Sequence, residues 1–395
     1  MTAHVPVADA PSRVSTLELF FDLVFVFTIT HVTEIIVDHP APAGLGQAAI
    51  VLSVIFWMYG GYAWLTNATE PDSAARRLVL LVAMAGFFLA SLSVPDAFGG
   101  NGVAFGLAYL ALILVHAVGF LVFAGLGALR PVLRLFSCNL ISAGLVLAAG
   151  WVHGVADWAL WLAAVAVQLA TPVVAQTGRH YRINVEHFTE RHGLVILIVL
   201  GESLINLGLS EGHGTVTLRT AVGVLAGLLA AATIWWSYFV GEDARAAAAL
   251  AAAPPQRRPT LAITGYFFAH LAMIYGILVI AAGIGTSAPE LTGHLDGASA
   301  WLIAGGAAIF LVGSGAFRAA LGYADYRPRI VGGASCLTAV PAGLATSAAV
   351  ELVVVASIVA LTLAADAAVA HRNGRHGSGR RAGWADRTAS AKMSA

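Results

Sequence analysis

Two stretches of the sequence carry ionisable side chains inside apolar runs. In the first, Ser15–Glu34, the acids Glu18 and Asp22 are four residues apart and so share one face of a helix, and His31 follows about two and a half turns later. Carboxyl and imidazole groups can exchange protons or bind cations. At bilayer depth they are tolerated where they face protein, a partner or water. This stretch therefore predicts a helix in the interior of a membrane bundle.

The second stretch, His187–Gly208, has the same character. His187, Glu190 and Arg191 have helical spacing at its start, where we expect an inner gate or, as the alternative, a plain interfacial ion pair. Glu202 lies twelve residues after Glu190, about 18 Å along a helix, with apolar residues between them. At that depth Glu202 must be paired, protonated or in contact with water. A functional role is the favoured hypothesis, and a structural hydrogen bond is the alternative.

Three predicted helices place polar groups at one depth. Thr30–His31, Glu202–Ser203 and His270 all lie twelve or thirteen residues past a charged residue that marks the helix start. A histidine beside a buried glutamate predicts a proton relay, an ion site or a solute site. A polar cluster that only fixes packing is the first alternative. Two His and one carboxylate could also hold a metal, but their position on separate helices is weak support, and no metal site is assigned.

A further polar layer is expected nearer the cytoplasm, where the second predicted helix brings Asn67 to the depth of Asp22, to which its amide could donate. On that helix Trp57 and Trp64 share a face, for which packing is the commoner explanation. His116 is interpreted as structural. The predicted substrate or ion path consists of Asp22, His31, Asn67, Glu202, Ser203 and His270, and the predicted cytoplasmic gate or ion pair of Glu18, His187, Glu190 and Arg191.

The composition assigns the chain to the polytopic membrane proteins. Of its 395 residues, 59% are hydrophobic and only 11% are charged, against about 25% charged residues in soluble domains. The net charge is zero, so nothing indicates nucleic acid or an acidic partner. The two cysteines are too few for a disulfide framework or a four-cysteine zinc site.

Twelve apolar segments approach the ~20 residues that a membrane-spanning helix needs. The predicted fold class is therefore all-α, a polytopic transmembrane bundle of about twelve helices. Pro341 is expected to kink the eleventh helix, and Thr346, Ser347 and Glu351 to mark the hairpin before the last. The segments are residues 17–37, 45–66, 77–95, 102–126, 131–151, 156–177, 193–210, 217–240, 259–284, 299–321, 330–348 and 352–370.

The placement of basic residues supports this count. Every Lys and Arg except Arg219 falls in the leader, in the loops that follow even-numbered segments, or in the tail. The positive-inside rule then places both termini in the cytoplasm, in a multi-pass protein of the cell (plasma) membrane. One miscounted helix would scramble this segregation.

The sequence also has the marks of a 6+6 internal repeat. An offset of 172 residues pairs Glu18 with Glu190 and Trp64 with Trp236. Because six is an even number, the halves would run parallel, related by an axis along the membrane normal. Chance matching in apolar sequence is the alternative. The expected organisation is a cytoplasmic leader (1–16), a first repeat (17–177), a cytoplasmic linker (178–192), a second repeat (193–370) and a disordered basic cytoplasmic tail (371–395).

At these residues the sequence resembles the bacterial low temperature requirement protein A (LtrA) family, over about residues 17–370. The resemblance implies a multi-pass membrane fold and a link to growth in the cold, and it assigns no biochemical activity. His192 departs from the aromatic or other apolar residue expected at its position. The matching pieces are Leu17–Phe27, the Trp-rich second segment leading to Asn67, Glu190–Arg191, Leu200–Ser203, Tyr266–His270 and Gly276–Ile277.

Several classes of protein are excluded by missing motifs. No lysine precedes Lys392, so a retinal Schiff base has no attachment point. A Walker-type phosphate loop, a dinucleotide fingerprint, a His-Glu-x-x-His motif and a Gly-x-Ser-x-Gly elbow are all missing, so we expect no enzyme and no cofactor. The predicted partners are the lipid bilayer and a small solute or ion, and homo-oligomerisation is left open.

Two function classes remain. The first is a transporter or channel for a small solute or ion that uses the intramembrane acid and histidine layer. The second is a non-transporting membrane sensor or assembly protein whose polar layer is structural. A continuous polar cavity that reaches Glu202 would favour the first class, and a dry, fully paired cluster would favour the second.

Overall fold

The computed structural model describes residues 14–68, 72–124, 129–175, 183–210, 217–287 and 291–369. The leader up to residue 13, the start of the predicted linker and the predicted tail lie outside these residues. Throughout the described ranges every regular element is a helix, which confirms the all-α prediction. Among the described residues, ten helical segments are long and apolar enough to cross a membrane, some of which combine consecutive helices.

The first half of the chain forms α1 (Thr16–Asp38), α2 (Pro42–Ala68), α3 (Ala74–Ser93), α4 (Gly102–Ala124), α5 (Leu129–Ala149) and α6 (Val155–Val174). The second half forms α7 (Val185–Ser210), α8 (Leu218–Phe239), α9 (Glu242–Ala252), α10 (Arg258–Leu261), the π-helix η4 (Ala262–Ala269), α11 (His270–Thr286), α12 (Gly297–Ala320), α13 (Arg327–Cys336), α14 (Val340–Ala345) and a last helix, Ala348–Val369.

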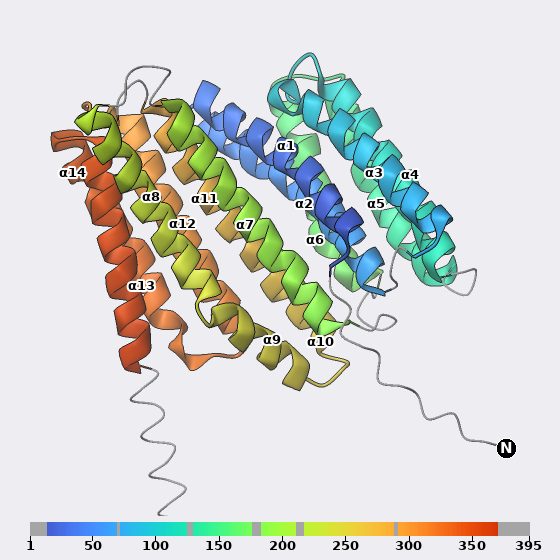
Figure 1. Cartoon of the computed structure of the whole chain (residues 1–395). Coiled ribbons are helices and arrows are strands. Elements are labelled where there is room, and N and C mark those ends of the chain that lie inside the picture. The colour runs from blue at the N-terminus through green and yellow to red at the C-terminus, as the bar shows by residue number, and fades with distance from the viewer. Residues whose placement is uncertain are drawn as a thin grey trace, which may run out of the picture.

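The helices gather on two sides of a central group (Figure 1). α3 to α6 lie together on one side, α8 and α12 to α14 lie on the other, and α1, α2 and α7 lie between them. α1 packs against α3 of the first half and against α7 and α11 of the second. The start of α1 and the end of the last helix lie at the same end of the bundle (Figure 1), as an even number of crossings requires.

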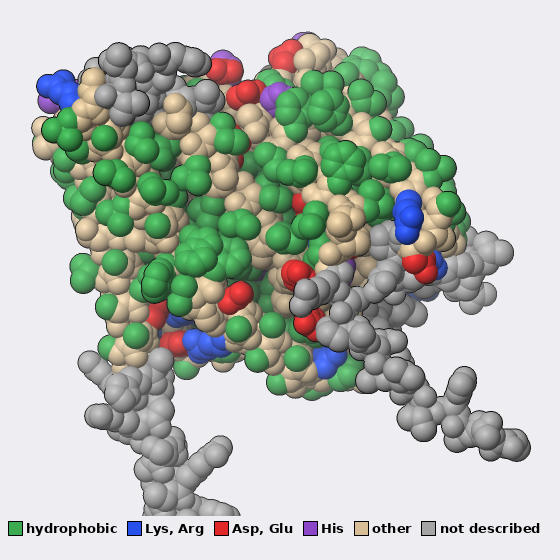
Figure 2. Space-filling view, in the orientation of Figure 1, with side chains coloured by type: hydrophobic (Ala, Val, Ile, Leu, Met, Phe, Trp, Pro, Cys, Tyr) green, Lys and Arg blue, Asp and Glu red, His purple; other side chains and the backbone are tan. Residues whose placement is uncertain are grey.

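The surface has the character of a membrane protein. Hydrophobic side chains cover the sides of the bundle, and charged side chains appear mainly near its two ends (Figure 2). Leu23, Leu89 and Leu361 are among the large apolar side chains that stay exposed. Such a surface is stable against acyl chains and would be a liability in water.

The helices differ from the sequence prediction in several places. α7 begins at Val185, so about two of its turns lie in the range assigned to the linker. α9 is a helix in a predicted loop, where the run of alanines after Glu242 favours helix. Glu351 was expected at the hairpin, but the chain breaks at Thr346–Ser347 and Glu351 is fully buried inside the last helix.

α11 and α12 approach so closely that only glycine fits between them. A methyl group added at Gly306 would lie 2.6 Å from both the carbonyl oxygen of Gly276 and the amide nitrogen of Ile280. One at Gly276 would meet the backbone of Phe310 at 2.5 Å. Small residues allow this approach where lipid provides no hydrophobic drive for helix association.

We therefore expect Gly306→Ala to lower stability by about 1–3 kcal/mol, because the backbones must separate. Gly305→Ala is the matched control, since its added methyl group has no atom within 4 Å. Thermal unfolding in detergent micelles measures both. Equal unfolding temperatures for the two variants would contradict the close packing.

Candidate functional site

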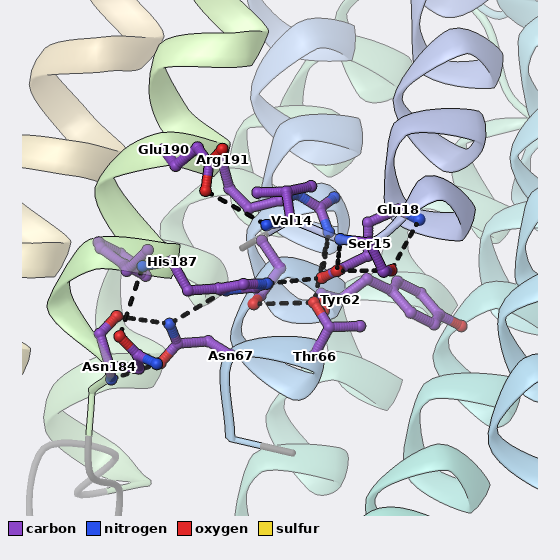
Figure 3. A network of polar contacts seen from close by, with 12 residues as sticks. Val14, Ser15, Glu18, Tyr62, Thr66, Asn67, Asn184, His187, Glu190 and Arg191 are labelled. Atoms are coloured by element: carbon purple, nitrogen blue, oxygen red, sulfur yellow. Dashed lines mark hydrogen bonds and ion pairs between the residues drawn. The ribbon is translucent and has the colours of Figure 1, made fainter. Parts of the chain in front are cut away.

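Buried charge is concentrated where α1, α2 and α7 meet (Figure 3). The guanidinium of Arg191 donates from Nη1 to Glu18 Oε1 at 2.9 Å and from Nη2 to Asp22 Oδ1 at 2.7 Å. All three residues are only 1% exposed. The four-residue spacing on α1 turns both carboxylates towards α7, as the sequence predicted for one helix face. One α7 cation therefore bridges two α1 anions.

Neighbouring side chains complete this network. His187 Nε2 lies 3.0 Å from Glu18 Oε1, and the hydroxyl of Tyr59 donates to Asp22 Oδ1 at 2.9 Å. Thr66 Oγ1 accepts from Arg191 Nη1 at 3.3 Å. We call Glu18, Asp22, Tyr59, His187 and Arg191 the charge network.

Glu18 also holds the start of α1. Its side chain accepts from the backbone amide of Ser15 at 2.9 Å, and the Ser15 hydroxyl accepts from the Glu18 amide at 3.3 Å, which is a capping box. The amide of Val14 donates to Glu190 at 3.2 Å. The residue before α1 is thus hydrogen-bonded to α7. A movement of α7 would therefore displace the first turn of α1.

The formal charges of the network do not cancel. Two carboxylates face one guanidinium, so the buried group carries one excess negative charge unless His187 is protonated or a carboxyl group holds a proton. Asp22 Oδ2 and Arg191 Nε are buried with no hydrogen-bond partner among the described residues. A proton is therefore the simplest means of balancing this site.

Asn67 lies beside the charge network, as predicted, but its contacts differ from the predicted one. Its amide donates to the Asn184 carbonyl at 2.8 Å and lies 3.3 Å from His187 Nδ1, and it does not donate to Asp22. Asp22 instead takes Tyr59 from the same helix, because Tyr59 is two turns deeper than Asn67. Asn67 orients the histidine that contacts Glu18.

The predicted deeper layer is formed only in part. Thr30 donates to Glu202 at 2.7 Å, so α1 and α7 do meet at this depth. Ser203 Oγ is buried without a partner among the described residues. His31 lies 3.7 Å from Glu34 and packs its ring on Phe27 at 4.3 Å. Its neighbours in these contacts, Glu34 and Phe27, are both on α1 itself.

His270 is engaged elsewhere. Its Nδ1 lies 3.0 Å from the Gly265 carbonyl and its Nε2 lies 2.9 Å from the Tyr238 hydroxyl. Its ring stacks on Tyr266 at 5.0 Å. The expected cluster of His31, Glu202 and His270 is therefore wrong as a set of contacts, since residue spacing fixes depth along a helix but not the direction in which each face points.

An aromatic cavity of about 90 Å³ lies beside the charge network. α2 contributes Trp57 and Trp64 to its wall, α4 contributes His116, and α7 contributes Phe188 and His192. His116 Nε2 is buried without a partner among the described side chains. The tryptophans and His116 thus line a space between the two halves, in addition to any role in packing.

A second buried ion-pair group was not predicted. It lies at the same end of the bundle, where α8, α9, α12, α13 and the last helix meet, and its charges balance. Its shortest contacts are Arg318 to Glu242 at 2.6 Å, Arg245 to Asp325 at 2.7 Å and Arg329 to Asp366 at 2.6 Å. Arg318 also lies 3.0 Å from Asp366.

The sequence held a signal for this group. Asp366 falls within the last apolar segment, four residues before its predicted end, where an acid is expected to face protein, a partner or water. Arg318 and Arg329 were counted only as basic residues that set topology, yet both are almost fully buried. Arginine can serve both purposes at a helix end, and sequence alone does not separate them.

The fold and its buried charges define a polytopic α-helical membrane protein. Its chain belongs to a family described as bacterial low temperature requirement A protein (LtrA), whose sequence pattern matches residues 13–365. An uncharacterized protein of Rhizobium meliloti (strain 1021) is 26% identical over 316 residues, which are 77% of this chain and 76% of the relative. No solved structure matches the chain significantly.

Removing the bridging cation should destabilise the bundle strongly. Arg191→Met leaves two buried carboxylates without their counter-charge, and we expect a loss of about 3–5 kcal/mol in thermal unfolding. Adding Glu18→Gln and Asp22→Asn to Arg191→Met should recover a large part of that loss. Arg76→Met is the control, with an expected change below about 1 kcal/mol, because its partner Asp72 is 68% exposed. No recovery in the triple variant would contradict the charge argument.

Asp325 gives a pH-dependent contribution that can be isolated. The hydrogen bonds from Arg245 hold the pKa of Asp325 below its usual range. Its stabilising contribution is therefore present above the unfolded-state pKa of about 4 and disappears as the pH falls through the lower folded-state pKa. The difference in unfolding temperature between wild type and Asp325→Asn should be largest at pH 7 and shrink below about pH 4. A difference that does not change with pH would exclude this ion pair as its source.

Proposed function

We propose that this protein is a transporter or channel for a small solute or ion, and that the charge network is its moving part. The observation that carries the proposal is the pairing of two buried carboxylates of α1 with a single guanidinium of α7. A site that needs a proton or a cation for balance can couple the binding of one to a change in helix packing.

The energetics of the network support this role over plain packing. A buried ion pair rarely stabilises a fold more than apolar side chains of the same size, because removing both charges from water costs several kcal/mol per ion. Helices of a membrane bundle can be held by close packing, as α11 and α12 are. The buried charges of α1 and α7 are therefore better explained by a conformational change between these helices than by a need to hold them together.

The same interface supports a repeat of two halves. The contacting pairs Thr30–Glu202 and Glu18–Arg191 are 172 and 173 residues apart, close to the offset seen in the sequence. Such contacts require α1 and α7 to run parallel and in register, as equivalent helices beside an axis along the membrane normal would. We propose residues 17–177 and 193–370 as the halves, with both termini cytoplasmic.

The aromatic cavity lies where relative movement of the halves would change it. Phe188 and His192 of α7 line this cavity, and they alternate with His187 and Arg191 of the charge network. On α2, Trp64 lines the cavity and Thr66 contacts Arg191. A rotation of α7 would thus alter the network and the cavity together.

The alternative function, a membrane sensor or assembly protein with a structural polar layer, is favoured by a different observation. Both oxygens of Glu18 are bonded, to Arg191 and His187 on one side and to Ser15 on the other. Glu202 lines neither the aromatic cavity nor the ion-pair region described above. A paired network of this kind could simply fix the packing of α1 on α7.

Flux into proteoliposomes separates the two functions. Liposomes containing pyranine would report proton movement under imposed K⁺, Na⁺ and Cl⁻ gradients. We expect flux by the wild type, and a decrease of about tenfold or more in Asp22→Asn and Glu202→Gln, with Asp72→Asn at the exposed surface as control. Folded protein that moves none of these ions or protons would favour the alternative.

A further inference from the structure

An acidic groove runs along a third face of α7. Glu186 and Glu190 of α7 line it, and each comes one residue before a side chain of the charge network, His187 or Arg191, so the two pairs lie on different faces of α7. Leu197 of α7 also lines the groove. α8, α9 and η4 form its other wall, and its volume is about 360 Å³. Acidic side chains surround a hollow over the lower parts of α7 and α9 in Figure 2.

The groove carries negative charge. Among the residues that the structure describes, its lining includes the carboxylates of Glu186, Glu190 and Asp243 and no Lys, Arg or His. The nearby cations point elsewhere, since Arg191 is held by α1 and Arg245 by Asp325. Carboxylates of one sign around a concave, low-dielectric wall concentrate cations.

A second observation indicates a ligand. The hydroxyl of Tyr266 is buried with no hydrogen-bond partner among the described residues, and Tyr266 is 1% exposed and lines this groove. A buried phenol without a partner is unfavourable, because its hydroxyl has lost its hydrogen bonds to water and gained none in the protein. A bound N–H group would donate to its oxygen and remove that penalty.

The chemistry of the lining selects among cations. Within the part of the chain that the structure describes, no three His, Cys, Asp or Glu side chains gather closely enough to hold a metal ion. The rest of the wall is apolar or aromatic, including Tyr238 and Phe239. Separated carboxylates on an aromatic wall suit an extended organic cation, whose methylene groups pack and whose ammonium groups pair.

We propose that this acidic groove is a binding site for a small organic cation with primary ammonium groups, which donate to Glu190, Asp243 and Tyr266. The ring of Tyr266 also contacts His192 and stacks on His270, neither of which lines the groove. His192 in turn lines the aromatic cavity, so one aromatic wall separates the groove from that cavity. The role of this cation as a transported solute rests on the proposed function, whereas its binding does not.

Isothermal titration of the detergent-purified full chain with 1,4-diaminobutane tests the site. We expect saturable binding that is weakened about tenfold in Glu190→Gln and in Asp243→Asn, and several-fold in Tyr266→Phe, for each lost charged or hydrogen-bonded contact. Asp38→Asn, an exposed acid at the other end of α1, is the matched control and should bind as the wild type does. Glu190 is exposed and Asp243 half-buried, so their variants should fold, which thermal unfolding verifies.

Tetramethylammonium and NaCl at equal ionic strength are the comparison ligands, because neither can donate an N–H hydrogen bond. Equal heats from NaCl, or diamine binding that is insensitive to all three groove variants, would overturn the proposal. Diamine binding without flux would contradict the proposed transport function and support the binding site. Flux without diamine binding would contradict the binding site and support the transport function.

Discussion

The guanidinium of Arg191, held between Glu18 and Asp22, is the interaction on which the rest of this structure depends. It joins α1 to α7 where all three side chains are buried, so water cannot replace a lost partner. α1 also contacts α3 and α11, so the helix that carries both carboxylates packs against helices from both parts of the bundle. Other faces of the same turns of α7 line the aromatic cavity and the acidic groove.

Much of the fold could be predicted from the sequence, because hydrophobic length and charge placement are one-dimensional signals. The boundaries of α8 and of the last helix agree with the predicted segments to within a few residues. The four-residue spacing of Glu18 and Asp22 also predicted correctly that both face protein. The π-helix η4 could not be predicted, since its wider turn depends on contacts made by Tyr266 and His270 with other helices.

The sequence predicted how deep in the bundle the candidate site residues lie, but not the direction in which their side chains point. Counting residues placed His31, Glu202 and His270 in one layer, but the rotation of each helix about its axis decides which side chains meet. That rotation is fixed by packing between distant segments, such as the glycine contact of α11 with α12. The buried roles of Arg318 and Arg329 were missed for a related reason. A basic residue at a helix end can set topology or pair with an acid, and only the neighbouring helix shows which.

The most direct measurement of the central claim is the reactivity of a thiol placed behind the Arg191 bridge. Thr66 is 3% exposed and contacts Arg191, so Thr66→Cys, in a background with Cys138 and Cys336 replaced by alanine, reports opening of this interface. If the network opens during function, a charged methanethiosulfonate reagent should modify this thiol in native membranes far faster than the protein unfolds. Modification only at the rate of global unfolding would contradict the account and leave the bridge as a static element of the fold.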